Sequence, residues 1–145
     1  MSKRIFTKRF SGQVEVGMPN MDFPAMDSWL LQENIEVIGA SIAVIPWQPS
    51  ENDGYTYLSV ELSQTGVFGL DGTILQCGAM EGWNTSPAGI SVHVGNVAVS
   101  FPNGAAVPVR EEGYLFVNAK GYFKTAGITN YNYGVTVYYT KGRSK

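Results

Sequence analysis

The sequence has one histidine, His93, and one cysteine, Cys77, which could pair as a base and a nucleophile. Histidine is the commonest general base, and a thiol beside it forms a familiar pair for nucleophilic attack. The sequence contains no GxSxG, HExxH, P-loop or GxGxxG pattern that would support either role. Cys77 lies in an apolar run, where a cysteine commonly serves as a small buried residue. We therefore expect neither enzyme activity nor a cofactor.

Carboxylates near turns offer a second kind of chemistry, the binding of a hard cation. Asp22 with Asp27, or the acidic segment 51–53, could supply oxygen ligands to calcium. The spacing of an EF-hand is absent, and the Asp-Gly pairs at 53–54 and 71–72 are ordinary turn residues. Local turn geometry accounts for these residues, so we expect no metal site.

Aromatic side chains offer a third possibility, stacking on the apolar face of a sugar. Trp47 stands between two prolines of the same segment, Trp83 precedes an asparagine, and Tyr131 and Tyr133 alternate near the end of the chain. Such rings also fill cores and oligomer interfaces, and the sequence brings no two of them together. Trp47 and Trp83 are the candidate stacking residues, with burial as the competing explanation.

The charges are unevenly distributed along the chain, although the net charge is only −2. From Phe10 to Val109 there is no lysine or arginine, while ten of the twelve carboxylates fall in that stretch. An acidic body with a pI near 5.3 disfavours nucleic-acid binding, which needs a basic face. Basic ends can dock on an acidic protein surface or can simply be solvated. The candidate docking residues, two of them apolar anchors, are Lys3, Arg4, Ile5, Phe6, Lys8 and Arg9.

Most of the chain alternates apolar and polar residues with the period of a β-strand, and turn residues separate the runs. Residues 24–33 predict one short helix, because Pro24 suits a first turn and Asp22 could cap it. The number and spacing of the strands are typical of an all-β sandwich or barrel. The predicted strands are Ile35–Ile45, Tyr55–Gln64, Thr73–Met80, Ile90–Phe101, Ala106–Val109, Tyr114–Ala119, Tyr122–Thr125 and Tyr133–Thr140.

A chain of 145 residues predicts one domain. We expect residues 1–12 to form a basic arm or a plain first strand, 13–141 the sandwich, and 142–145 a basic tail. Within the sandwich, Gly95-Asn96 predicts a two-residue hairpin turn that would place Val94 opposite Val97.

The run Val97–Ala119, followed by Tyr133–Lys141, resembles small jelly-roll proteins of virions, including capsid decoration proteins and head-fibre domains of tailed phages. The shared features are a corner of the type proline-valine, turn, glycine-tyrosine-leucine (108–115) and a last tyrosine-rich strand. The resemblance implies a single jelly-roll-like β-sandwich of about eight antiparallel strands. The resemblance does not assign a function to any individual residue of this sequence.

The resemblance also implies a role: a structural virion protein, specifically a decoration (cement) protein that binds and stabilises a phage head. Its partners would be copies of itself in a homotrimer and the major capsid protein. Two alternatives stay open, a carbohydrate- or receptor-binding fibre or tail module and a shell-forming jelly-roll capsid subunit of a small virus. Neither a secretion signal nor an apolar stretch of membrane-spanning length occurs, so we expect synthesis in a host cytoplasm and residence in the virion.

Overall fold

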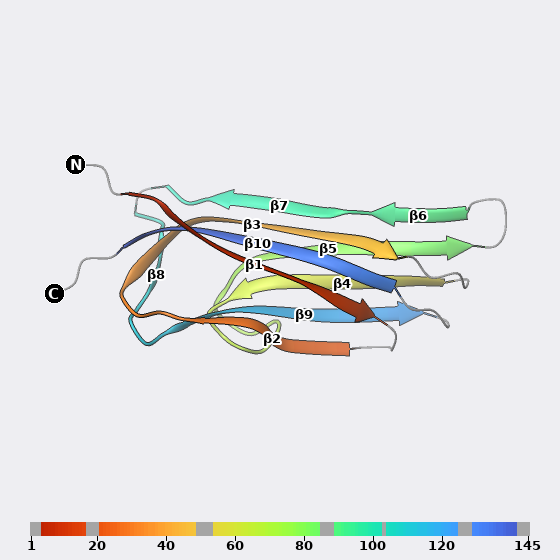
Figure 1. Ribbon diagram of the computed structural model, residues 1–145, viewed down its shortest axis with the longest axis horizontal. Coiled ribbons are helices and arrows are strands. Elements are labelled where there is room, and N and C mark those ends of the chain that lie inside the picture. Colours follow the sequence, from red (N-terminus) through yellow and green to blue (C-terminus); the bar gives the residue numbers. More distant parts are fainter. Residues whose placement is uncertain are drawn as a thin grey trace.

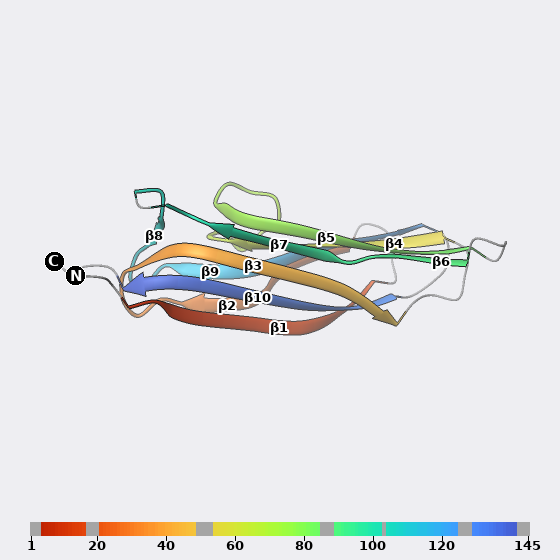
Figure 2. The same cartoon turned by 90° about the horizontal axis from the view of Figure 1, so that it is seen from above.

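The computed structural model describes residues 4–16, 21–48, 54–84, 89–102, 104–124 and 129–141. These residues form two layers of β-sheet packed face to face (Figures 1 and 2). No helix in the described residues is long and apolar enough to span a membrane. The strands are β1 (Phe6–Val16), β2 (Met21–Leu30), β3 (Ile35–Gln48), β4 (Gly54–Ser63), β5 (Thr73–Asn84), β6 (Gly89–His93), β7 (Gly95–Ser100), β8 (Val107–Val109), β9 (Tyr114–Lys124) and β10 (Thr129–Lys141).

Each layer is a five-stranded sheet in which consecutive strands often belong to different layers. Sheet A has the order β1-β10-β3-β7, with β8 pairing on the far end of β3, and sheet B has the order β2-β9-β4-β5-β6. Every pairing given by the described residues is antiparallel. Connections that pass from one layer to the other are typical of jelly-roll sandwiches. The predicted all-β sandwich is therefore confirmed.

The core lies between the sheets and follows the two-residue period of the strands. Along β10, Tyr131, Val135 and Val137 are buried, and along β4 the residues Leu58 and Val60 oppose them from sheet B. Because these side chains alternate with outward-facing residues, each sheet keeps one face for the core and one face for other contacts.

The predicted helix at residues 24–33 is wrong, because residues up to Leu30 belong to strand β2, which pairs with β9. The register slips between Phe23 and Asp27, on either side of Pro24. Proline is tolerated in a sheet at such an irregularity on an edge strand, and β2 is the edge of sheet B. A helix of ten residues has little stability of its own, whereas the strand gains a partner along its length.

The predicted hairpin at Gly95-Asn96 is also wrong. Strand β6 pairs with β5 in sheet B, and β7 continues in the same direction but pairs with β3 in sheet A (Figure 1). The chain thus crosses between the sheets at Val94 and does not turn back. A Cβ atom on Gly95 would overlap the carbonyl oxygen of Gly78 in β5. Glycine is required there for the close approach of two backbones, not for a turn.

The corner at residues 108–115 links β8 of sheet A to β9 of sheet B. The Leu31 N–H donates to the carbonyl of Gly113, and the Glu112 N–H donates to the carbonyl of Leu31, both at 2.9 Å. Glu112 has a positive φ of 68°, so the turn closes tightly. The corner noted in the sequence is therefore fastened to the loop that leads from β2 to β3.

Two tyrosines of β10 cross the core and reach sheet B. The hydroxyls of Tyr131 and Thr56 lie 2.7 Å apart, and the Tyr133 hydroxyl donates to Oδ2 of Asp27 at 2.6 Å. Burial, and then the hydrogen bond to Asp27, raise the pKa of the Tyr133 hydroxyl well above its ordinary value. The phenol is consequently held in its protonated form in the folded protein.

We expect Tyr133→Phe to lower the free energy of unfolding at neutral pH by about 1 to 3 kcal/mol, because Asp27 loses its donor. In the wild type, the unfolded chain releases the Tyr133 proton above pH about 10 while the folded chain retains it, so stability falls as pH rises further. The free energy of unfolding of the variant should decrease less steeply with pH in this range. Urea unfolding at pH 7 and at alkaline pH measures both effects, and identical alkaline slopes for the two proteins would exclude this coupling.

Candidate functional site

The centre of the outer face of sheet A is built from small, uncharged side chains. Residues facing outward on neighbouring strands fall into rows fixed by the strand register. We call the central rows the small-residue face; its members are Ser11, Gly134, Ala43 and Asn96 in one row and Thr136, Ser41 and Ala98 in the next. Arg9 continues the second row onto the edge strand β1.

Larger apolar side chains stand beside the small-residue face and are exposed. Tyr138 is 39% exposed, Ile45 is 44% exposed, and Val94, just before β7, is 56% exposed. Exposed apolar residues that border an uncharged patch are typical of protein contact surfaces. This face can therefore be covered by another protein at little cost in desolvated charge.

The predicted docking residues divide into exposed and inward-facing groups. Arg4, Ile5 and Arg9 are exposed, Ile5 to 58%. Lys3 and the tail at 142–145 lie outside the described residues. Residues 6–12 belong to β1, so this part of the expected arm runs as the first strand along β10.

Phe6 and Lys8 contact other parts of the sandwich. The Phe6 ring stacks on Tyr139 with the ring centres 5.6 Å apart. The Lys8 ammonium lies 5.5 Å from the ring centre of Trp29 and 5.6 Å from that of Phe10. The contact with Trp29 links β1 to β2 across the open edge of the sandwich. Docking by the exposed members of the set stays a prediction.

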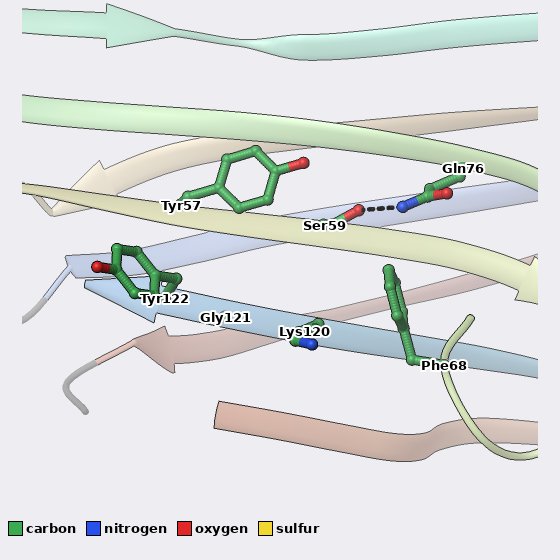
Figure 3. Close-up of a pocket in the computed structure, with 7 residues that line it drawn as sticks. All are labelled: Tyr57, Ser59, Phe68, Gln76, Lys120, Gly121 and Tyr122. Carbon is green, nitrogen blue, oxygen red and sulfur yellow. Dashed lines mark hydrogen bonds between the residues drawn. The ribbon is translucent and has the colours of Figure 1, made fainter. Parts of the chain in front are cut away.

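The outer face of sheet B is different, because it contains a pocket of about 290 Å³ (Figure 3). Strands β4, β5 and β9 form its floor, and the loop at 64–72 forms one wall. Within it, Nε2 of Gln76 donates to Oγ of Ser59 at 2.9 Å. The lining residues are Tyr57, Ser59, Phe68, Gln76, Lys120, Gly121 and Tyr122.

The loop wall is held in place by one carboxyl group, that of Glu61. This side chain faces away from the core, yet it is 0% exposed because the loop at 64–72 covers it. It accepts hydrogen bonds from the Gly69 N–H (3.1 Å), the Thr73 hydroxyl (3.0 Å) and Nδ2 of Asn118 (3.1 Å). Three donors from separate segments thus converge on Glu61 and fix the loop that carries Phe68.

The candidate nucleophile is not placed for reaction with solvent or substrate. Cys77 is buried, and burial raises the pKa of its thiol, which disfavours the reactive thiolate. The backbone of His93 pairs with Met80, three residues along β5 from Cys77; the His93 side chain lies outside the described residues. The described residues therefore show a thiol that is poorly suited to act as a nucleophile.

Of the candidate metal ligands, only Asp27 has a described side chain. Asp27 accepts the hydrogen bond from Tyr133, and residues 51–53 lie outside the described part of the chain. Among the residues that the structure describes, no group of three histidine, cysteine or acidic side chains could hold a metal ion.

The candidate stacking residues lie on different sheets. Trp47 belongs to β3 of sheet A and Trp83 to β5 of sheet B, and their side chains lie outside the described residues. Tyr131 and Tyr133 are buried in the core, so they cannot stack on a ligand. The aromatic residues of the pocket, Tyr57 among them, were not indicated by the sequence.

No protein-family model matches this sequence, and no curated protein matches it either. Among solved structures, the decameric BFDV capsid protein is similar over 97% of this chain and 100% of its own, at 13% identity and a TM-score of 0.46. Eiger TNF from S. frugiperda is similar over 97% of this chain and 95% of its own, at 10% identity and a TM-score of 0.41. Desmodium yellow mottle tymovirus is similar over 100% of this chain and 92% of its own, at 7% identity and a TM-score of 0.38.

Proposed function

We propose that this chain is a non-catalytic structural module that assembles with copies of itself through the small-residue face of sheet A. The observation that carries the proposal is that face itself, uncharged across three neighbouring strands and bordered by exposed Tyr138, Ile45 and Val94. The exposed apolar margin is unfavourable to leave in water, and covering the uncharged centre removes no charge from water.

The size of the face supports a second copy of the chain as its occupant. Four strands spaced about 4.8 Å apart and some 30 to 40 Å long present roughly 600 to 700 Å². A stable protein interface buries about 800 Å² on each partner. The outer face of sheet A, with the small-residue face at its centre, therefore supplies most of the area that one subunit contact needs.

The charge distribution supports the same assignment. The segment from Phe10 to Val109 carries ten carboxylates and no lysine or arginine, so copies of this body repel one another over much of their surface. Self-association is least opposed where charge is absent, and the central rows of sheet A meet that condition.

For the biological role, we propose a structural virion protein of the decoration type, in which a homotrimer binds the major capsid protein. The resemblance of the 97–119 and 133–141 segments to jelly-roll virion proteins motivates this part. Arg4 and Ile5, at the exposed start of β1, are the proposed points of capsid contact.

The mass of the purified protein, measured by light scattering at micromolar concentration, tests the assembly. A trimer has three times the chain mass of 15.8 kDa, about 47 kDa. A mass of 15.8 kDa at every concentration would contradict self-association. Closed shells of many copies would instead support the shell-forming alternative and overturn the decoration role.

A further inference from the structure

The pocket on sheet B has the composition of a binding site and not of a subunit contact. It is concave, lies on the sheet opposite the small-residue face, and combines aromatic walls with a cation (Figure 3). Its volume of about 290 Å³ is near the lower end of the range for small-molecule sites, about 300 to 1,000 Å³. A ligand of one or two rings is therefore the appropriate size.

The aromatic part of the pocket is held in position by its neighbours. Tyr57 of β4 and Tyr122 of β9 are directly paired across the two strands. A Cβ atom on Gly78 would overlap the Tyr57 ring, so the ring lies across that glycine. Phe68 approaches from the loop that Glu61 fixes (Figure 3). Rings held in this way can stack on an apolar ligand face with little loss of side-chain entropy.

The polar part of the pocket lies next to the paired tyrosines, two residues further along β4 and two residues back along β9. Ser59 is paired in register with Lys120, and the Gln76 amide donates to the Ser59 hydroxyl. An amide and a hydroxyl can exchange hydrogen bonds with the hydroxyls of a sugar. The Lys120 ammonium, which is exposed at the pocket, supplies a positive charge for an anionic group.

The surroundings limit how much negative charge the ligand can carry. On the β2 side of strand β9, Lys120 is paired in register with Asp22. Most of the chain is acidic. A polyanion such as a nucleic acid needs several cations in a row and would be repelled by this body. A single carboxylate can be matched by a single ammonium.

From these observations we infer that the pocket binds a carbohydrate unit bearing one carboxylate, such as a uronic or sialic acid residue. One sugar face stacks on Tyr57, the carboxylate meets Lys120, and hydroxyls bond to Ser59 and Gln76. This site is separate from the small-residue face, so either proposal can fail without the other.

Titration of the ¹⁵N-labelled protein with galacturonic acid and N-acetylneuraminic acid, followed by amide chemical shifts, tests the inference. We expect saturable shifts at residues 57–59, 68 and 120–122, and weaker binding of neutral galactose. Lys120→Gln should weaken the binding of the acidic sugars about tenfold and remove the preference over galactose. Tyr57→Ala should abolish binding of all three sugars.

Lys141→Gln is the matched control, because Lys141 is an exposed lysine whose ion pair with Glu33 lies outside the pocket. It should bind like the wild type. The inference would be overturned if the wild type showed no saturable shifts, or if Lys120→Gln and Lys141→Gln lost affinity for the acidic sugars equally. Tighter binding of a short oligouridylate than of the acidic sugars would also overturn it. Lys120 is exposed, so its substitution should not disturb folding even if Tyr57→Ala does.

Discussion

Replacing Glu61 with leucine should reduce the free energy of unfolding by about 3 to 5 kcal/mol, because three hydrogen bonds to one buried carboxyl group are lost together. The Gly69 N–H, the Thr73 hydroxyl and Nδ2 of Asn118 all donate to this carboxyl group. Leucine has a similar size but accepts no hydrogen bond, so the loop at 64–72 should detach from the sheet. Urea unfolding measures the loss of stability, and hydrogen exchange of the Gly69 amide measures the detachment.

Two variants sharpen the Glu61 experiment. Glu61→Gln keeps one acceptor oxygen but adds donors, so we expect an intermediate loss of stability. Glu111→Leu removes an exposed acidic side chain and should change stability by less than about 0.5 kcal/mol. If Glu61→Leu were as stable as Glu111→Leu, with the Gly69 amide still protected, the proposed anchoring of the loop would be wrong.

The strands of this protein could largely be predicted because their residues alternate with a two-residue period. The tyrosine-rich strand β10 is an example, since Tyr131, Tyr133, Val135 and Val137 all face the core as alternation requires. The charge separation was likewise visible in the sequence. Local pattern is sufficient where a strand has one buried and one exposed face.

The two errors in the fold arose where a tertiary contact overrides a local signal. Residues 24–30 have a plausible helix start, but pairing with β9 and packing of Trp29 on Tyr139 favour a strand. Gly95-Asn96 has the composition of a hairpin turn, but Gly95 serves the approach to Gly78 of another strand. Neither partner is near in sequence, so no local pattern could reveal it.

The pocket was missed for a related reason. Its residues come from positions 57, 59, 68, 76 and 120–122, and only the sheet register brings them together. One signal was present: Ser59, Glu61 and Ser63 alternate with apolar residues along β4 and mark a polar outer face. That the loop at 64–72 folds back over this face depends on Glu61, whose burial the sequence does not indicate.

The two outer faces of the sandwich therefore suit different partners. The centre of sheet A presents small uncharged residues with an exposed apolar margin, as a subunit contact requires. Sheet B presents a concave site with a cation and fixed aromatic rings, as a small anionic ligand requires. Assembly through sheet A would leave the sheet B pockets facing outward, one on each subunit.

Replacing Ala43 with glutamate should abolish self-association while leaving the monomer folded. Ala43 faces outward in the central row of the small-residue face, between Gly134 and Asn96 on the neighbouring strands. In the monomer the new carboxylate reaches water, so its effect on stability should be small. In the assembly it would be buried without a partner, which should raise the dissociation constant by roughly a hundredfold or more.

Light scattering of Ala43→Glu and of the matched variant Ser28→Glu, at equal micromolar concentration, tests the small-residue face as the subunit interface most directly. Ser28 is exposed on β2 of sheet B, so the two variants add the same charge to opposite faces. We predict about 15.8 kDa for Ala43→Glu and three times that mass, about 47 kDa, for Ser28→Glu and the wild type. A trimeric mass for a folded Ala43→Glu would show that the subunits meet elsewhere.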